Sequence, residues 1–374
     1  MSSAISETLE KVRSGGRVNQ EEALVLLNAR GTDLHEVCAA ADAIREMRVG
    51  DDVTYVINRN INFTNICIGS CGFCAFRARE GDPEAYFLSV DEIVKRAVQA
   101  SRTGATEVGI FSGLHPSVDG HTYVEIVRAV KKAVPAIHIH AFSPSEVAYG
   151  AEKLGISHVE MLKMLKDAGL DSMPGTAAEI LVDRVRKTLC PQKIDTTTWT
   201  DIIVSAHRLG IPSTCTMMYG HIESYEDIVA HLELLRTIQG TTGGFTEFVP
   251  LTFIHYNTPI YRAGLARPGA TGREDLLIFA VGRLYLDNIP NIQVSWVKLG
   301  TKFAQVALTC GANDLGGTLM EENITRSAGG TAGQSLEPSE FIRMITDLGR
   351  VPRVRDTLYH IRAAHQGEVH NASF

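Results

Sequence analysis

Three cysteines that lie within one eight-residue stretch limit what this chain can fold around more than any other feature. They are Cys67, Cys71 and Cys74, in the spacing Cys-x3-Cys-x2-Cys. Gly69 and Gly72 stand between them and would let the backbone wrap closely around a bound group, with N–H groups turned toward sulfur. Buried structural cysteines have no reason to recur at this spacing, so the pattern predicts a metal centre.

Two kinds of metal centre suit closely spaced thiolates. Zinc takes four tetrahedral ligands, and structural zinc sites usually take two from each of two closely spaced pairs such as Cys-x2-Cys. The sequence has no second Cys-x2-Cys pair. A cubane [4Fe-4S] cluster normally takes four thiolates. Three thiolates would therefore hold three irons and leave the fourth open to a small molecule. We expect a [4Fe-4S] cluster on the three cysteines, with zinc as the alternative.

The composition excludes several other classes of protein. The chain has 374 residues, is 44% hydrophobic and carries a net charge of −7, so it has no basic surplus that would hold nucleic acid as a main partner. No run approaches about 18 apolar residues, so no membrane span is expected. The polar N-terminal stretch has no apolar signal-peptide core. We expect a cytoplasmic protein, in whose reducing surroundings cysteines serve metals or catalysis more often than disulfides.

From Val53 onward, short β-rich runs alternate with amphipathic helical runs. Repeated strand–helix units predict a parallel sheet with right-handed crossovers. Six or more such units favour a closed α/β barrel of the TIM type over an open doubly wound sheet. Ser89 and Ser224, each with an acidic residue close behind, are predicted helix N-caps. The predicted strands cover residues 53–59, 61–65, 106–112, 137–142, 170–173, 213–219, 245–251 and 292–296.

The pattern divides the chain into three expected parts. Residues 1–50 form an N-terminal helical extension, residues 51–335 form the (β/α) barrel, and residues 336–374 form a C-terminal helical extension and tail. The Gly-rich polar segment from Asn313 to Ser335 is expected to be a loop at a late strand end, flexible or facing a ligand.

The cysteine motif, placed after the first strand of a parallel α/β chain, resembles that of the radical S-adenosylmethionine superfamily. The resemblance implies that the open iron chelates the amino and carboxylate groups of S-adenosylmethionine. An electron from an external donor, passed through the cluster, would then cleave the sulfonium to methionine and a 5′-deoxyadenosyl radical. Phe73 matches the aromatic position that packs on adenine. Ser112 and Gly113 occupy the place of the glycine-rich strand that receives the methionine amino group, although relatives usually carry Gly in place of Ser112.

Further motifs resemble the group that contains the two-part FO synthase and two menaquinone-pathway enzymes, aminofutalosine synthase and dehypoxanthine futalosine cyclase. The stretches Gly175–Ile180 and Cys190-Pro191 are most similar to the tyrosine-using subunit of FO synthase. The menaquinone enzymes tend toward a Gly-Gly-Gly-Ala-Glu version of the first stretch. The other stretches that carry the resemblance are His138–Pro144, Thr216–His221 and Glu247–Leu251.

This resemblance implies a reaction. The Cα–Cβ bond of L-tyrosine would break, and the 4-hydroxybenzyl radical would add to 5-amino-6-(D-ribitylamino)uracil. A ring-closing FO synthase subunit, as pathway partner, would then complete FO (7,8-didemethyl-8-hydroxy-5-deazariboflavin). The alternative within the same class is a menaquinone-pathway radical enzyme acting on a futalosine-type substrate. From a different class, the alternative is a non-catalytic iron–sulfur or zinc-binding module.

The candidate site residues follow from the motifs and from the rule that barrel active sites lie at the C-terminal ends of strands. Glu179 could hold the ribose hydroxyls of S-adenosylmethionine and Arg184 its carboxylate, because an Arg fork suits a carboxylate. The expected cofactor-binding residues are Phe73, Ser112, Gly113, Ser143, Glu179 and Arg184. The candidates for catalysis are His115, His140, Tyr219 and His221, and those for substrate binding are Glu247, Asn313 and Asp314.

Overall fold

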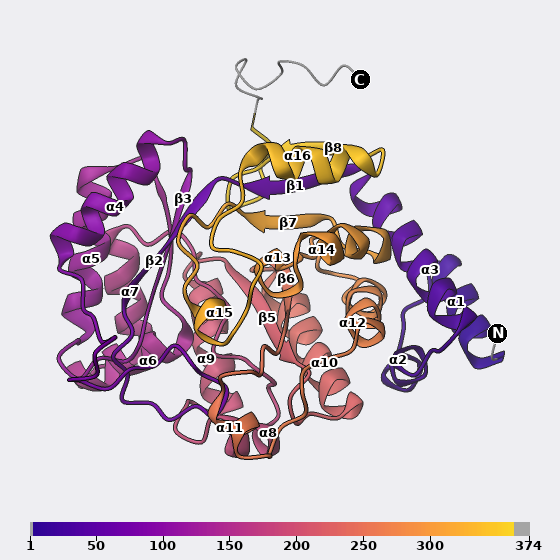
Figure 1. Cartoon of the computed structure of the whole chain (residues 1–374), viewed down its shortest axis with the longest axis horizontal. Coiled ribbons are helices and arrows are strands. Elements are labelled where there is room, and N and C mark those ends of the chain that lie inside the picture. The colour runs from indigo at the N-terminus through magenta and orange to yellow at the C-terminus, as the bar shows by residue number, and fades with distance from the viewer. Residues whose placement is uncertain (1–2, 363–374) are drawn as a thin grey trace.

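The computed structural model describes residues 3–362, and its centre is a ring of parallel strands (Figure 1). The strands are β1 (Asp52–Val56), β2 (Asn58–Thr64), β3 (Glu107–Ser112), β4 (His138–Ala141), β5 (Ser213–Tyr219), β6 (Phe245–Thr252), β7 (Asp314–Gly317) and β8 (Val351–Val354). All pairings among them are parallel, as the strand–helix alternation predicts.

Short bridges join the paired strands into a closed barrel. Strands β2, β3 and β4 form one sheet, and β5 pairs with β6. Residues 172–173 bridge β4 to β5, and residues 292–293 bridge β6 to β7. The ring closes where the Asn60 N–H of β2 donates to the Leu319 carbonyl, at 2.8 Å, just beyond β7. The expected TIM-type barrel is therefore confirmed: strands β2 to β7 and the two bridging segments make up the ring, while β1 and then β8 extend the sheet from β7.

Helices cover the outside of the ring. Those between β2 and the end of the barrel are α4 (Val90–Arg102), α5 (Gly120–Ala133), α6 (Pro144–Leu154), α7 (His158–Ala168), α8 (Asp183–Leu189), α9 (Thr196–Arg208), α10 (Tyr225–Thr242), α11 (Pro259–Arg262), α12 (Gly272–Tyr285), α13 (Trp296–Leu299), α14 (Thr301–Ala307), the 3₁₀ turn η1 (Leu308–Cys310) and α15 (Ile324–Ser327). Ser89 and Ser224 form capping boxes on α4 and α10, so both predicted N-caps are confirmed. Within residues 3–362, no helix has the length and apolar character needed to cross a membrane.

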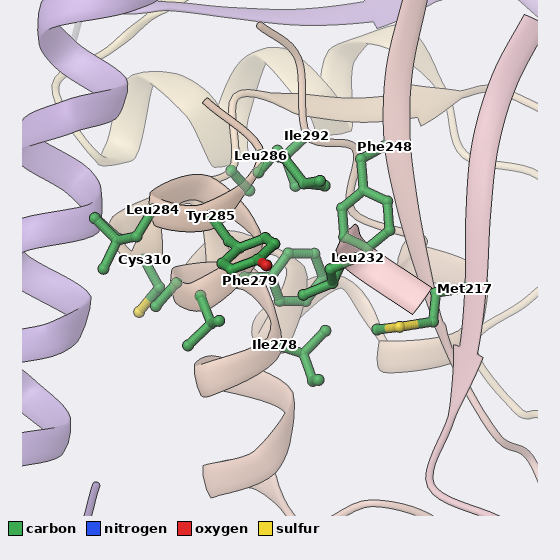
Figure 2. Close-up of a cluster of buried hydrophobic side chains, with 14 of the residues drawn as sticks. Met217, Leu232, Phe248, Ile278, Phe279, Leu284, Tyr285, Leu286, Ile292 and Cys310 are labelled. Atoms are coloured by element: carbon green, nitrogen blue, oxygen red, sulfur yellow. The ribbon is translucent and has the colours of Figure 1, made fainter. Parts of the chain in front are cut away.

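The hydrophobic core lies between the strands and the helices. Figure 2 shows one part of it, where Met217 of β5 and Phe248 of β6 meet Leu232 of α10 and Phe279 of α12. Since alternate residues of a strand point to opposite faces, the other residues of each strand face the inside of the barrel. On β2, for example, Ile61 and Phe63 pack in the outer core. Asn58, Asn60 and Asn62 therefore line the interior.

The N-terminal segment forms three helices, α1 (Ser3–Arg13), α2 (Gln20–Leu27) and α3 (Thr32–Val49). They lie beside α12 (Figure 1) and share its hydrophobic core, for instance through Val37 and Ala41 of α3. The expected division into three parts stays a prediction, and residues 363–374 of the third part lie outside the described range.

The late part of the chain contains two strands that the sequence did not indicate. Strand β7 begins inside the Gly-rich segment expected to be a loop, and β8 forms within residues 336–374, which were expected to be a helical extension and tail. Both pair with β1, and α16 (Pro338–Asp347) covers them, with Phe341 stacked on Tyr55 at 5.0 Å. The composition of β7, Asp-Leu-Gly-Gly, conceals the strand because its backbone is fixed by neighbours rather than by β-branched side chains.

Candidate active site

The three cysteines lie on the loop between β2 and α4. The backbone N–H groups of Gly69 and Leu114 both donate to the Cys67 sulfur, each at 3.3 Å. Gly72 fastens the middle of the loop: its N–H donates to the Leu189 carbonyl and its own carbonyl accepts from the Ile260 N–H, both at 2.8 Å. Figure 1 shows the two helices that provide these anchors, α8 and α11, next to each other at the lower edge of the barrel.

The three thiols face a common space. Burial raises the pKa of the Cys71 thiol to about 11; the nearby Lys193 ammonium opposes this rise, and the neighbouring thiols of Cys74 and Cys67 add to it. Burial likewise raises the pKa of Cys74, and Cys67 contributes there too. Across the described residues, no three or more His, Cys, Asp or Glu side chains converge as ligands of one metal ion. A Cβ atom at Gly69 would lie 3.3 Å from the Cys67 sulfur and 4.0 Å from the Cys71 sulfur, so these two sulfurs border the same space beside the loop backbone.

Gly113 brings the end of β3 directly against the cysteine loop. A Cβ atom at this position would lie 2.4 Å from the Ile66 carbonyl oxygen and 2.9 Å from the Cys67 Cβ. Any side chain here would push the two segments apart, so glycine is required for the close approach. The close approach also explains how the Leu114 N–H reaches the Cys67 sulfur.

A charged group lies beside the thiols. The Lys193 ammonium donates to Glu179 Oε1 at 2.7 Å and stands 5.1 Å from the centroid of the Phe73 ring. The second carboxylate oxygen of Glu179 is buried and has no hydrogen-bond partner among residues 3–362. Two expected cofactor-binding residues, Phe73 and Glu179, are thus brought together, and Lys193, which the sequence reasoning did not single out, lies between them.

The backbone that carries Glu179 is strained. Ala177 and Glu179 have φ values of 62° and 41°, in the left-handed region that non-glycine residues rarely adopt. Arg186 holds this backbone in place, because its buried guanidinium donates to the carbonyls of Ala177 and Ala178 at 3.1 and 2.5 Å. Such strain is typical of functional sites, where the surroundings fix an unfavourable geometry.

Arg184, the expected carboxylate ligand, points elsewhere in this structure. Its side chain is 68% exposed and pairs with Asp227 at the start of α10, at 2.5 Å. Arg186 is the arginine beside Glu179, with 3.8 Å between a guanidinium nitrogen and Glu179 Oε2. The role given to Arg184 stays a prediction, and it would require the side chain to leave Asp227.

Glu146, which the sequence did not indicate as a site residue, connects Ser112 and Ser143. Glu146 accepts the N–H and the hydroxyl of Ser112 on Oε1, at 3.0 and 2.9 Å. It accepts the same two groups of Ser143 on Oε2, both at 2.7 Å. Burial raises the pKa of Glu146. This carboxylate ties the end of β3 to the start of α6, and the capping-box spacing Ser143-x-x-Glu146 is the sequence signal that could have revealed it.

His115 and His221 lie just after β3 and β5, and Tyr219 is the last residue of β5, but each is engaged by the surrounding protein. His115 Nδ1 accepts the Ser117 N–H at 3.0 Å, and its ring stacks on Phe87. Tyr219 donates to Asp275 of α12 at 2.7 Å, which places its hydroxyl in the helix layer. His221 is buried between the Met218 carbonyl and Glu223. Their assignment to catalysis stays a prediction.

His140 lies on the inner face of the barrel. Its Nδ1 and the Nε2 of His138 both lie 2.7 Å from the Ser172 hydroxyl. Burial lowers the pKa of His140 to about 4, although the nearby Glu107 carboxylate opposes this. The imidazole is therefore neutral at pH 7 and can accept or donate one hydrogen bond.

Glu247, Asn313 and Asp314 lie near the starts of β6 and β7, so they are at the end of the barrel opposite the cysteines. Asp314 is fully buried and pairs with Arg355 at 2.5 Å, while Glu247 accepts from the hydroxyl of Tyr359. Asn313 accepts from the Arg283 guanidinium at 2.7 Å. These three residues form the closed floor of the barrel in this structure. Their proposed contact with substrate stays a prediction.

Comparisons with known proteins agree with this geometry. Residues 61–235 match the family described as the radical SAM superfamily, and residues 242–367 match the family described as the CofH/MqnC C-terminal region. Among solved structures, methylornithine synthase is similar with a TM-score of 0.74 and 18% identity, covering 92% of this chain and 97% of that one. A maturase of the [FeFe]-hydrogenase is similar with a TM-score of 0.73 and 18% identity, covering 94% and 76%. These two likenesses show the fold.

Curated relatives are much more similar in sequence. A protein of Methanothermobacter thermautotrophicus is 54% identical over 91% of this chain and 94% of its own length. One of Methanocaldococcus jannaschii is 56% identical over 92% and 97%. Both carry the name 5-amino-6-(D-ribitylamino)uracil–L-tyrosine 4-hydroxyphenyl transferase.

Proposed function

Because this chain belongs to the radical SAM superfamily and, within it, to the family of 5-amino-6-(D-ribitylamino)uracil–L-tyrosine 4-hydroxyphenyl transferases, we propose that it joins the 4-hydroxybenzyl group of L-tyrosine to 5-amino-6-(D-ribitylamino)uracil. The Cα–Cβ bond of tyrosine is broken and a bond to the uracil is made. The observation that carries the proposal is the high identity to these relatives over almost the whole chain.

The cofactors of the superfamily are a [4Fe-4S] cluster and S-adenosylmethionine, and the residues present fit both. Cys67, Cys71 and Cys74 would hold the cluster, with two N–H groups already directed at the Cys67 sulfur. Phe73 and the carboxylate oxygen of Glu179 that accepts no hydrogen bond would hold the adenosyl group. When bound, the two cofactors supply a 5′-deoxyadenosyl radical as the hydrogen-abstracting species.

The protein itself contributes enclosure and polarity. The thiols lie on a loop at the C-terminal ends of the strands, and helices cover the outside of the barrel. Inward-facing amide and imidazole groups, among them Asn60, Asn62 and His140, offer hydrogen bonds to polar substrates. An enclosed interior also protects a carbon-centred radical from side reactions with solvent.

We further propose that the protein works in the cytoplasm with an external electron donor and that a ring-closing FO synthase subunit consumes its product. All seven cysteines are free thiols, which suits a reducing compartment. The ring-closing partner follows from the chemistry, because joining a hydroxybenzyl group to the uracil leaves the third ring of a deazaflavin open.

The proposed function is tested by product analysis. Anaerobically reconstituted protein, reduced and given S-adenosylmethionine, should form 5′-deoxyadenosine only when tyrosine is present. With the ribitylaminouracil also present, mass spectrometry should detect the hydroxybenzyl adduct. Turnover of a futalosine-type substrate, with none of tyrosine, would replace this proposal with the menaquinone-pathway alternative.

Cys71→Ser is the matching test of the cluster. The variant should lose most of its iron and sulfide after reconstitution and all tyrosine-dependent 5′-deoxyadenosine, because two thiolates grip a cubane poorly. Cys215→Ser provides the control, since this thiol is buried on β5 and faces the outer core. Full iron content in Cys71→Ser would contradict the assignment of the ligands.

A further inference from the structure

Asn62 lies inside the barrel, on the strand that leads to the cysteines. Ile61 and Phe63 on either side of it pack outward in the hydrophobic core, so the Asn62 carboxamide faces inward. In the β2–β3 register it lies beside Phe111. Cys67 follows it after a few residues in the sequence, which places the carboxamide just inside the barrel from the thiols.

The carboxamide of Asn62 is unusual because it is buried and unbonded. The residue is 4% exposed, and neither its oxygen nor its nitrogen has a hydrogen-bond partner anywhere in residues 3–362. Asn58, on the same strand and face, donates to Glu107 at 2.8 Å and accepts from the Leu319 N–H at 2.9 Å. Burying an unpaired amide is destabilising, so folding alone does not account for Asn62.

An aromatic ring and a second amide surround this position. Phe111 folds back across Gly109 toward Asn60: a Cβ at Gly109 would lie 2.7 Å from the Phe111 ring and 2.9 Å from Asn60 Oδ1. The ring also meets His140 edge-on, with 6.3 Å between centroids. Glycine at position 109 therefore makes room for a flat apolar face next to two carboxamides.

We infer that Asn62 binds the imide edge of the pyrimidine substrate, with the ring packed against Phe111. A carboxamide presents one donor and one acceptor side by side, and the uracil N3–H with an adjacent carbonyl is the complementary pair. The phenol of tyrosine offers its donor and its acceptor on one oxygen, whereas the uracil edge offers them on two adjacent atoms, as the carboxamide does. This inference rests on the proposed function and assigns one of its two substrates to a place in the barrel. Both polar atoms of the Asn62 side chain are buried, so binding requires the side chains around them to move.

The direct test is a binding measurement on reconstituted protein with S-adenosylmethionine and without tyrosine. Isothermal titration with 5-amino-6-(D-ribitylamino)uracil should show at least tenfold weaker binding to Asn62→Leu and to Asn62→Asp, because neither side chain offers the donor–acceptor pair. Asn58→Leu, the matched control on the same face, should bind within about twofold of wild type. Wild-type affinity in Asn62→Leu would overturn the inference.

Two further readouts separate this inference from the proposed function and from a structural role. Asn62→Leu should raise Tm, because it removes an unpaired buried amide, while Asn58→Leu should lower it. A loss of Tm in Asn62→Leu equal to that in Asn58→Leu would mean that Asn62 is a bonded structural amide, and the inference would fail. Asn62→Leu should also keep tyrosine-dependent 5′-deoxyadenosine formation with a raised KM for the uracil. If wild type forms none, the proposed function itself fails.

Discussion

Lys193 is a partly buried cation beside the thiols that would hold a negatively charged cluster. It pairs with Glu179 at 2.7 Å, and both Cys71 and Glu179 favour its charged form, which raises its pKa despite burial. A fixed positive charge near a redox centre stabilises the reduced, more negative state. We therefore expect Lys193 to support the reduction of the cluster and to orient the carboxylate of Glu179.

Lys193→Met should separate these tasks from folding. We expect the reduction potential of the cluster to become more negative and the affinity for S-adenosylmethionine to fall about tenfold, roughly 1.4 kcal/mol, because Glu179 loses its partner. Redox titration followed by electron paramagnetic resonance, together with equilibrium dialysis, measures both. Lys193→Arg should restore much of each value, and Lys187→Met, an exposed lysine on α8, should change neither. An unchanged potential in Lys193→Met would contradict this role.

At the scale of elements, the C-terminal segment closes the floor of the barrel. Strand β8 pairs with β1, and the residues after it enter the barrel end: Arg355 pairs with Asp314 at 2.5 Å and with Glu247 at 3.5 Å. Thr357 donates to Glu107 at 2.6 Å. One short segment thus supplies ion-pair or hydrogen-bond partners to three buried carboxylates on three different strands.

Arg355→Met should destabilise the protein by about 3–5 kcal/mol, since it leaves buried carboxylates without their cation. Arg353→Met, two residues earlier on β8, is the matched control. Its ion pair with Asp52 is 46% and 40% exposed, and surface pairs contribute roughly 0–1 kcal/mol. Chemical denaturation measures both variants. Equal losses of unfolding free energy would show that the buried pairs of Arg355 with Asp314 and Glu247 contribute no more than a surface pair.

The elements also show what the sequence could and could not predict. Strands β3, β5 and β6 were predictable because their apolar, β-branched runs are bounded by turn signals. The cysteine loop was predictable because the Cys-x3-Cys-x2-Cys spacing is specific for a metal centre. Strand β7 was not, since Gly316 and Gly317 are selected by close contacts: a Cβ at each would lie 2.2 Å from Gln293 and 2.1 Å from Asn58. The substrate roles of Glu247 and Asp314 were predicted from their positions near strand ends. The sequence did not show at which end of the barrel these residues lie. It also did not show that Arg355 pairs with both of them.

For the molecule as a whole, the buried Glu247 at the barrel floor predicts how the unfolding free energy varies with pH. Burial raises the pKa of Glu247 to about 7, with the Asp314 charge adding to the rise and Arg355 opposing it. An acid whose pKa is higher in the folded state than in the unfolded state binds more protons when folded. Its contribution to the unfolding free energy is therefore present below about pH 4.5 and is lost as the pH rises through about 7.

Glu247→Gln should remove this dependence, because an amide does not titrate. The difference in unfolding free energy between wild type and variant should change by up to roughly 3 kcal/mol between pH 4.5 and 7, with wild type losing stability as the pH rises. Denaturant titrations at a series of pH values give this difference directly. Parallel curves for the two proteins would show that folding does not shift the pKa of Glu247.

The anchoring of the cysteine loop has a consequence for the life of the protein in a cell. The loop is held by bonds that need no iron, from Gly72 to Leu189 and Ile260 and from Cys67 to Ala78. In a zinc finger, by contrast, losing the metal means losing the fold. We therefore expect the loop to stay folded when oxygen destroys the cluster, so that a new cluster can be inserted into the same chain.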